Sequence, residues 1–193
     1  MTAEQLSGTL PPGHLGQKEV LASAKVPQGW INQTAPLRQG SARTLDVSID
    51  LGDGRLLTGT VDNVFGNRIV SVTYSSLAAK QRLTSWLDLL ALSVAFPDES
   101  WTAHAVGKGR GGTPTRALAG PLDHQALDWL KDLVALYDEG QCRPLPAPIK
   151  TACAWAEGQR QQDRGSDRSP AEAAERAWVT DRNNSFNIPG EHA

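Results

Sequence analysis

Residues 43–76, "RTLDVSIDLGDGRLLTGTVDNVFGNRIVSVTYSS", decide the fold class of this chain. Apolar and polar residues alternate along the stretch, which is typical of strands that bury one face. The turn dipeptides Asp53-Gly54 and Gly66-Asn67 divide it into three segments, because such pairs favour tight hairpin turns. The sequence therefore predicts three antiparallel strands joined as a meander.

The spacing of apolar residues changes after Leu77 to that of a helix. Residues 78–95 carry them along one face, and Pro97 ends the pattern. The residues concerned are Leu83, Trp86, Leu87, Leu90 and Val94. The next segment, "SWTAHAVG" at 100–107, alternates again. We expect a helix packed on the sheet and then a fourth strand parallel to the third, since the helix carries the chain back across the sheet.

Two further helices are predicted toward the C-terminus. Residues 121–140 have apolar residues at helical spacing. Residues 169–182 begin with Ser169 as the N-cap and have Glu172 three residues later, which is the pattern of a capping box. The glycine run at 107–112 is predicted to be a mobile connecting loop.

The order of these elements predicts an α/β fold with a central mixed sheet, an antiparallel meander plus a crossover strand, flanked by helices. Residues 1–42 are rich in Gly, Pro, Ser and Gln and are predicted to be an irregular N-terminal segment. Residues 43–193 then form one domain with a helical tail. A chain of 193 residues is long enough for one hydrophobic core with appendages.

The composition excludes several classes of protein. The 19 basic and 21 acidic residues give a net charge of −2, so overall charge does not drive nucleic-acid binding, although a local basic path stays open. No secretory signal or membrane span is visible, and we expect a cytoplasmic protein with no membrane partner. The cysteines and histidines are too few and too scattered for a disulfide framework or a metal site: Cys142, Cys153, His14, His104, His124 and His192.

Asp62, on the second predicted strand, suggests one half of a nuclease site. A magnesium-dependent nuclease needs an aspartate on one strand, a second acid on the adjacent strand and a nearby lysine. The adjacent strand has neither an acid nor a lysine within 69–79. We therefore expect no catalytic residue and no bound metal here. The alternative is an active metal-dependent nuclease in which Asp46, Asp50 or Asp53 serves as a migrated second carboxylate.

Four blocks of sequence carry a family resemblance. They are "GTLPPGHLG" at 8–16, "GTVDNVFGNRIVSVTYSSLAAKQRLTSWLDLLAL" at 59–92, "DWLKDLVALYDEGQCRPLPAPIKTACAWA" at 128–156 and "FNIPGE" at 186–191. In this order they resemble the C-terminal domain of the gamma chain of exodeoxyribonuclease V, the RecC subunit of the RecBCD helicase–nuclease. The resemblance covers nearly the whole chain.

The wider superfamily is the PD-(D/E)xK nuclease fold, whose active members read approximately G-x-I-D-x-V-F, a turn, and then D-Y-K-S. Positions that match are Gly59, Asp62, Val64, Phe65, Tyr74 and Ser76. Thr73 stands where the second carboxylate belongs, and Ser75 stands where the lysine belongs. The resemblance therefore implies a PD-(D/E)xK nuclease-like fold that is catalytically inactive, with Asp62, Thr73 and Ser75 as vestigial positions.

The resemblance also implies a function. In this family the subunit holds RecB-like and RecD-like subunits together, separates the strands of a DNA end, channels the single strands and takes part in recognising the Chi sequence during double-strand-break repair. We expect a scaffold and DNA guide whose partners are those subunits and DNA. No cofactor is expected for this domain, because magnesium and ATP are used by the other subunits.

Two hypotheses name DNA-contacting residues. The turn "VFGNR" at 64–68 would act as a wedge, with Phe65 stacking on a base and Arg68 on phosphate, and Lys80 and Arg82 would contact a nucleic-acid backbone. The simpler interpretation is a buried Phe65 and solvated surface charges. A third function stays open, a protein-interaction module that makes no contact with DNA.

Overall fold

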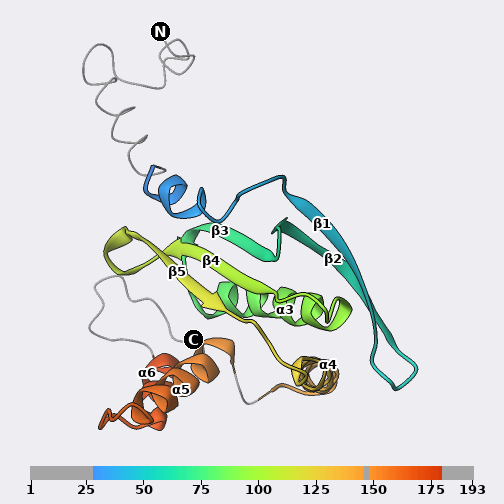
Figure 1. Ribbon diagram of the computed structural model, residues 1–193. Coiled ribbons are helices and arrows are strands. Elements are labelled where there is room, and N and C mark those ends of the chain that lie inside the picture. The colour runs from blue at the N-terminus through green and yellow to red at the C-terminus, as the bar shows by residue number, and fades with distance from the viewer. Residues whose placement is uncertain (1–27, 146–147, 180–193) are drawn as a thin grey trace, which may run out of the picture.

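The computed structural model describes residues 28–145 and 148–179 (Figure 1). The blocks at 8–16 and 186–191, together with His14 and His192, lie outside the described residues. Chain segments within the described part form five strands and four longer helices. These are β1 (Arg43–Asp50), β2 (Leu56–Phe65), β3 (Arg68–Ser76), α3 (Ala79–Ala95), β4 (Thr102–Lys108), β5 (Pro114–Ala119), α4 (Ala126–Cys142), α5 (Ile149–Gln162) and α6 (Pro170–Trp178), with the 3-10 turn η1 (Arg110–Gly112) between β4 and β5.

The five strands form one mixed sheet in the order β1-β2-β3-β4-β5. β1, β2 and β3 pair antiparallel, and β4 pairs parallel to β3 after the crossover through α3. The predicted meander, crossover helix and parallel fourth strand are confirmed. β5 pairs antiparallel to β4 and was not predicted, because six residues that begin with a proline give a weak strand signal. The glycine run before it forms the tip of this hairpin, where Gly109 N–H donates to Thr113 O at 2.8 Å.

A β-bulge shapes the second strand. Leu45 pairs with Val61 and Arg43 with Val64, so β2 has one more residue than β1 between these two pairs. Asn63, inside the bulge, has φ +56°, a left-handed conformation that asparagine tolerates better than most residues. As a consequence, Val61 and Val64 both belong to the core that faces α3.

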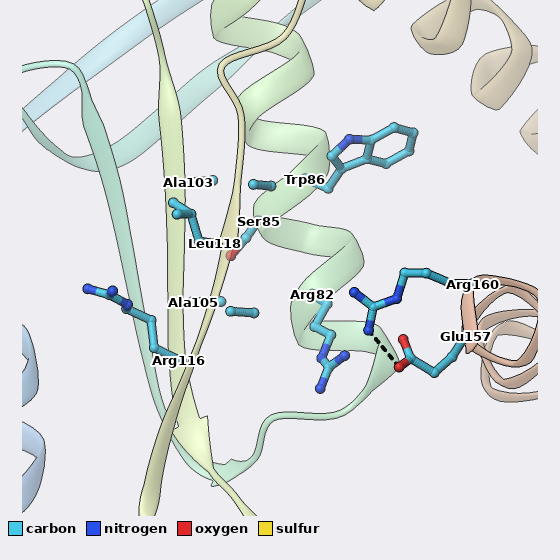
Figure 2. Close-up of a pocket in the computed structure, with 11 residues that line it drawn as sticks. Arg82, Ser85, Trp86, Ala103, Ala105, Arg116, Leu118, Glu157 and Arg160 are labelled. Atoms are coloured by element: carbon cyan, nitrogen blue, oxygen red, sulfur yellow. Dashed lines mark hydrogen bonds and ion pairs between the residues drawn. The ribbon is translucent and has the colours of Figure 1, made fainter. Parts of the chain in front are cut away.

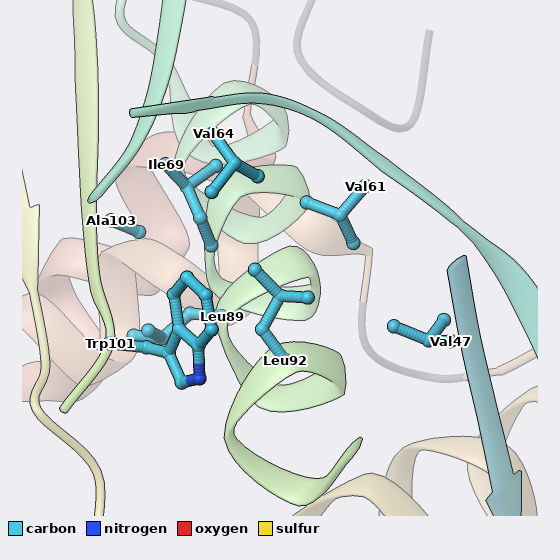
Figure 3. Packing of buried hydrophobic residues seen from close by; sticks show 8 residues of the cluster. All are labelled: Val47, Val61, Val64, Ile69, Leu89, Leu92, Trp101 and Ala103. Carbon is cyan, nitrogen blue, oxygen red and sulfur yellow. The ribbon is translucent and has the colours of Figure 1, made fainter. Parts of the chain in front are cut away.

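The main core lies between the sheet and α3 (Figure 3). Its buried members are Val47, Val61, Val64, Ile69, Leu89, Leu92, Trp101 and Ala103. Trp101 Nε1 donates to Phe96 O at 3.1 Å, so the indole N–H is satisfied inside an apolar environment. The alternation of β1 to β3 and the helical spacing of α3 thus meet in one layer, as the sequence predicts.

A smaller apolar cluster lies on the opposite face of the sheet. It consists of Trp30, Leu37, Phe65, Val70 and Val106. Trp30 comes from a short helix over 28–34, which lies on the other side of the sheet from α3 (Figure 1). The N-terminal segment is therefore not irregular throughout: its described end folds back and covers β3 and β4, because Trp30 and Leu37 find an apolar surface there.

The C-terminal helices partly match their predictions. α4 begins at Ala126, five residues later than predicted, because Asp123 Oδ1 accepts the Gln125 N–H at 3.0 Å in a turn before the helix. The capping box of α6 is confirmed: Ser169 Oγ accepts the Glu172 N–H at 3.2 Å. α5 was not predicted, and it packs closely on α6, since a Cβ at Gly158 would lie 2.9 Å from Pro170 Cα. None of the described helices is long and apolar enough to span a membrane.

Candidate functional site

The β2–β3 hairpin holds the positions that resemble a nuclease site. Only two residue pairs join its strands, Val64 with Ile69 and Phe65 with Arg68, and the strands diverge beyond them. The turn is tied to the neighbouring strand by Arg43, whose Nη2 donates to Gly66 O at 3.1 Å. The hairpin is thus short, and its turn is anchored to β1.

The three vestigial positions do not form a common cluster. Asp62 Oδ1 accepts a hydrogen bond from Thr44 Oγ1 of β1 at 2.6 Å. The hydroxyls of Thr73 and Ser75 bond to each other at 2.7 Å, and Gln81 Nε2 donates to Ser75 Oγ at 3.5 Å. The β2–β3 pairing ends at Val64 with Ile69, so neither Asp62 nor Thr73 lies within the paired part of the hairpin. Asp62 is therefore held by β1, and the two β3 hydroxyls are held by each other and by α3.

The carboxylates considered as migrated ligands lie at different distances from Asp62. Asp50 accepts the Gly52 N–H at 2.8 Å and Asp53 pairs with Arg55 at 2.6 Å, so both stabilise the β1–β2 turn. Asp50 is six residues along β1 from Thr44, which is about 20 Å. Neither carboxylate can share a cation with Asp62 at that separation.

Asp46 is closer, because it lies opposite Thr60 and therefore diagonal to Asp62. Within residues 28–145 and 148–179, no three His, Cys, Asp or Glu side chains come together as metal ligands. Asp46 and Asp62 alone would give a cation two carboxylates, fewer ligands than magnesium or calcium sites usually have.

Asp88, a carboxylate on the crossover helix, is close enough to Asp62 to be affected by its charge. The pKa of Asp88 is raised, mainly because the side chain is partly buried and also because the negative charge of Asp62 is near. Asp88 lies on α3, which contacts β3 through the hydrogen bond between Ser85 and Ser71. Ser71 precedes Asp88 by seventeen residues in the sequence. Sequence reasoning missed this pair, because only the packing of α3 on β2 brings the two acids close.

Phe65 is unavailable for the wedge role. Its side chain is only 7% exposed and packs with Trp30, Leu37 and Val70. The guanidinium of Arg38 lies 6.0 Å from the ring centroid, over one side of the ring. The hypothesis that Phe65 stacks on a base is therefore corrected, since stacking would require the ring to leave its apolar cluster. The simpler interpretation, a buried phenylalanine, is confirmed.

The other predicted DNA contacts do not lie together. Arg68 is the first residue of β3, whereas Lys80 and Arg82 lie in the first turns of α3, beyond the end of β3 at Ser76. The strand between them is roughly 26 Å long. Arg68 shares its face of the sheet with Val70 and the short helix over 28–34, and Arg82 lies on the α3 side. A DNA-binding role for these three residues stays a prediction, in two separate places.

Four cationic side chains and a histidine gather on the face of the sheet that carries Arg68. We call this the basic face and define it by Arg38, Arg68, His104, Lys108 and Arg116. Strand register brings Arg68 opposite Thr102 and Arg116 opposite Val106, with His104 between them on β4. Arg116 was missed because β5 was not predicted.

His104 reports the electrostatics of the basic face. It is 8% exposed, its Nε2 lies 3.4 Å from Thr102 Oγ1, and its Nδ1 has no hydrogen-bond partner among the described residues. Burial lowers the pKa of His104, and the positive charges of Arg116 and Arg68 lower it further. The imidazole is therefore neutral near pH 7, and the positive charge around it comes from Arg68 and Arg116.

The cations of the basic face lack acidic partners. In the described part of the chain, the ion pairs link Arg55 to Asp53 and Asp138, Arg143 to Glu139, and Arg160 to Glu157. Lys108 Nζ instead lies 5.9 Å from the ring centroid of Tyr74. Tyr74 is 63% exposed, and its ring lies 5.6 Å from that of Trp30. Unpaired cations beside an exposed aromatic ring are the features that bind single-stranded nucleic acid.

A second polar site lies on the other side of the sheet (Figure 2). It is a cavity of about 510 Å³ between α3, the edge of the sheet and α5, and we call it the slot. Its lining includes Arg82, Trp86, Ala103, Ala105, Ala117, Ala119, Glu157 and Arg160. Arg160 Nη2 donates to Glu157 Oε1 at 2.7 Å, and this bond is the main reason that the pKa of Glu157 is lowered.

An apolar groove of about 780 Å³ separates the β1–β2 hairpin from α3 and α4. Leu56, Leu87 and Tyr137 line it and are exposed to solvent. At its rim, Arg55 Nη1 bonds to Asp138 Oδ2 at 2.6 Å and ties the hairpin to α4. Exposed apolar surface of this kind commonly marks a contact with another protein surface.

Comparison with known proteins shows the family. Residues 1–160 match the family described as the RecC C-terminal domain. The chain belongs to this RecC family. It is 48% identical over 157 residues to the RecBCD enzyme subunit RecC of Mycolicibacterium smegmatis, an alignment that covers 80% of this chain and 14% of the relative. It is 41% identical over 182 residues to the RecBCD enzyme subunit RecC of Mycobacterium tuberculosis, covering 93% of this chain and 16% of the relative.

The chain therefore spans about a seventh of the length of these RecC relatives. The comparison confirms the resemblance to the RecC C-terminal domain. The site residues that sequence reasoning missed, Arg116, Asp88 and Arg160, lie on elements whose neighbours could not be read from the sequence. The only available signal was the isolated arginine in "PTRALA", an unusual residue in an otherwise small and apolar stretch.

Proposed function

We propose that this RecC C-terminal domain is a non-catalytic scaffold and DNA guide in a RecBCD-type complex that acts in double-strand-break repair. The observation that carries the proposal is the basic face, where Arg68 and Arg116 flank a neutral His104 without a carboxylate partner in the described residues. Its relatives are named as RecC subunits of the RecBCD enzyme.

The fold proposed for this domain is the PD-(D/E)xK nuclease-like one. An antiparallel three-strand meander, a crossover helix and a parallel fourth strand support it. Under this proposal Asp62, Thr73 and Ser75 are vestigial. Their separate hydrogen bonds, Asp62 to Thr44 and Thr73 to Ser75, are consistent with positions that no longer share a cation.

The DNA would run across the basic face. Arg68, Arg116 and Lys108 would contact phosphates, and the exposed Tyr74 would offer a ring for stacking. Arg68 closes the β2–β3 turn, so a strand on this face would pass the hairpin, which agrees with a role in strand separation. Single-strand channelling, Chi recognition and contact with RecB-like and RecD-like subunits belong to the same proposal. Magnesium and ATP would be used by those other subunits.

Binding of forked DNA to this chain tests the guide role. We expect the double variant Arg68→Ala/Arg116→Ala to bind at least tenfold more weakly at low salt, because two unpaired phosphate contacts are lost. Arg164→Ala/Arg176→Ala is the matched control, since it removes two exposed arginines from the C-terminal helical region. Equal affinity of wild type and Arg68→Ala/Arg116→Ala would place the DNA on another surface, and no detectable DNA binding by the wild type would favour the interaction module without DNA contact.

The second candidate function, an active metal-dependent nuclease, rests on the diagonal arrangement of Asp46 and Asp62. Calorimetry with magnesium and manganese and a cleavage assay on linear duplex DNA test it. The proposal of a non-catalytic domain requires no metal-dependent cutting by this chain. Cutting that disappears in both Asp62→Ala and Asp46→Ala would establish the nuclease instead.

A further inference from the structure

The edge of the sheet at β5 is an open hydrogen-bonding surface. Gly109 N–H donates to Thr113 O, and bonded and non-bonded pairs alternate along an antiparallel ladder. The bonded pairs that follow are Gly107 with Thr115, Ala105 with Ala117, and Ala103 with Ala119. The main chains of Arg116 and Leu118 therefore point outward, each offering one N–H and one C=O.

An independent contact supports this assignment. Pro114 belongs to the same outward-facing set, and its carbonyl accepts a hydrogen bond from Gln33 Nε2 at 3.0 Å, from outside the sheet. For Arg116 and Leu118, no backbone partner beyond the sheet is present in the described part of the chain. β5 also lacks the usual protections of an edge strand, since it has no bulge and its single proline is at the start.

We propose that β5 binds an extended acidic peptide segment, which adds as a sixth strand beside Arg116 and Leu118 and occupies the slot. The slot provides the space: Ala117 and Ala119 have small side chains, and α5 stands across the cavity with Glu157 and Arg160 (Figure 2). A strand added at the usual spacing of about 4.8 Å would lie between β5 and α5. This interaction goes beyond the proposed guidance of DNA and does not depend on it.

The charges around the edge select the side chains of the added strand. On the α3 side, Arg82 is exposed and lacks an ion-pair partner among the described residues, and Arg160 is 57% exposed beside Glu157. Arg116 also lines the slot, and its guanidinium extends away from α3 and α5 toward the basic face (Figure 2). Successive side chains of a strand point to opposite faces, so acidic residues on either face would find an arginine.

The remaining neighbours favour a peptide over a nucleic acid. Leu118 is 58% exposed on the outer face and would contact an apolar side chain of the added strand. The outward carbonyls of Arg116 and Leu118 would repel phosphates. A peptide main chain satisfies both the open N–H and the open C=O groups, whereas a phosphate backbone satisfies only the former.

Selection of peptides from a library tests the proposal. Random eight-residue peptides displayed on phage would be selected on the full chain and counter-selected on Leu118→Pro, which removes the outward N–H without removing a bond to β4. We expect enriched sequences that combine Asp or Glu with β-branched residues. Synthetic copies should bind at least tenfold more weakly to Leu118→Pro and to Arg82→Glu/Arg160→Glu, while Leu118→Ala and Arg176→Glu retain most of the affinity.

Hydrogen exchange gives a second readout that is independent of folding defects in the variants. Binding of an enriched peptide to the wild type should slow exchange at the Arg116 and Leu118 amides. The proposal is overturned if selection yields no binder sensitive to Leu118→Pro, if the binders are basic or helical, or if these two amides remain unprotected. If oligo-dT displaces the peptide, and Arg82→Glu/Arg160→Glu weakens the binding of both ligands equally, the slot is a nucleic-acid site instead.

Discussion

The two faces of the sheet differ in what their side chains do. On the α3 face, Val64, Ile69, Leu89 and their neighbours make a dry layer that water does not reach. On the opposite face, a small cluster around Trp30 covers only part of the strands, and the rest carries arginines around a neutral histidine. Because successive side chains of a strand point to opposite faces, alternate residues of β3 and β4 supply stability on one side and charge on the other. Substitutions on the two faces should therefore have separable effects.

The largest effect is expected from the α3 face. Leu89→Ala should lower the free energy of unfolding by about 3 kcal/mol, because the side chain is fully buried and the helix cannot close the resulting cavity. Leu118→Ala, an exposed leucine on the opposite face, is the control, with an expected change below about 0.5 kcal/mol. Urea unfolding of both variants measures the contrast. Similar destabilisation by the two changes would mean that the faces are not separate in this way.

The basic face should show the converse behaviour. Arg68→Ala/Arg116→Ala should leave the unfolding midpoint in urea nearly unchanged, because neither guanidinium has an acidic partner in the described residues. In DNA binding, the slope of log K against log salt should become shallower by about 1.5, for two lost phosphate contacts. An unchanged slope would show that DNA, if it binds, uses another surface.

The buried histidine links the basic face to pH. The pKa of His104 is lowered in the folded protein, so below its ordinary value the unfolded chain binds a proton that the folded chain does not. Stability should therefore fall as the pH falls from about 6.5 through the lowered pKa of His104. His104→Asn should remove this part of the pH dependence in urea titrations at pH 7.5 and 5.

The same histidine also gives a spectroscopic check. Arg116→Ala should raise the pKa of His104 in an NMR titration, because one of the charges that lower it is gone. Arg176→Ala should not change it. A pKa that stays the same in Arg116→Ala would place the arginine too far from the ring to matter.

The smallest effect concerns the acids near the hairpin. Because the pKa of Asp88 is raised in the folded protein, stability falls as the pH rises from the ordinary pKa of an aspartate to the raised value. Asp88→Asn should therefore be more stable than the wild type at pH 7, and this advantage should be smaller at pH 3. Asp62→Asn should lower the pKa of Asp88 only slightly, because burial is the larger cause. NMR titration of the Asp88 carboxyl carbon in both backgrounds measures the difference. A large fall would make the charge of Asp62 the main cause.

Local patterns predicted the elements whose signal is strong. The meander, the crossover helix, the parallel fourth strand and the Ser169 cap all follow from alternation, helical spacing or capping chemistry. The helix over 28–34 was missed because Gly29 and the nearby Pro27 and Pro36 mask its spacing. It is stable because Trp30 reaches β3 and β4, a contact that no local window contains.

The site was less predictable than the fold, for a physical reason. Arg68 and Arg116 are far apart in the sequence and become neighbours of His104 only through the register of β3, β4 and β5. Conversely, Arg68 and Arg82 are close in the sequence but lie at opposite ends of β3. Charge clusters made by strand register are invisible until every strand is known, and β5 was the strand that the sequence did not reveal.

The bulge at Asn63 shifts the inward–outward alternation of β2 by one residue. Before it, Leu57, Gly59 and Val61 take the inward phase, and after it the inward phase restarts at Val64. If β2 kept Asn63 but ran straight without the bulge, Val64 would turn outward and Phe65 inward, whereas deleting Asn63 would restore regular alternation and leave both on their present faces. One left-handed residue beside Asp62 thus lets Val61 and Val64 both enter the core, so the apolar face of β2 continues past the bulge to the turn.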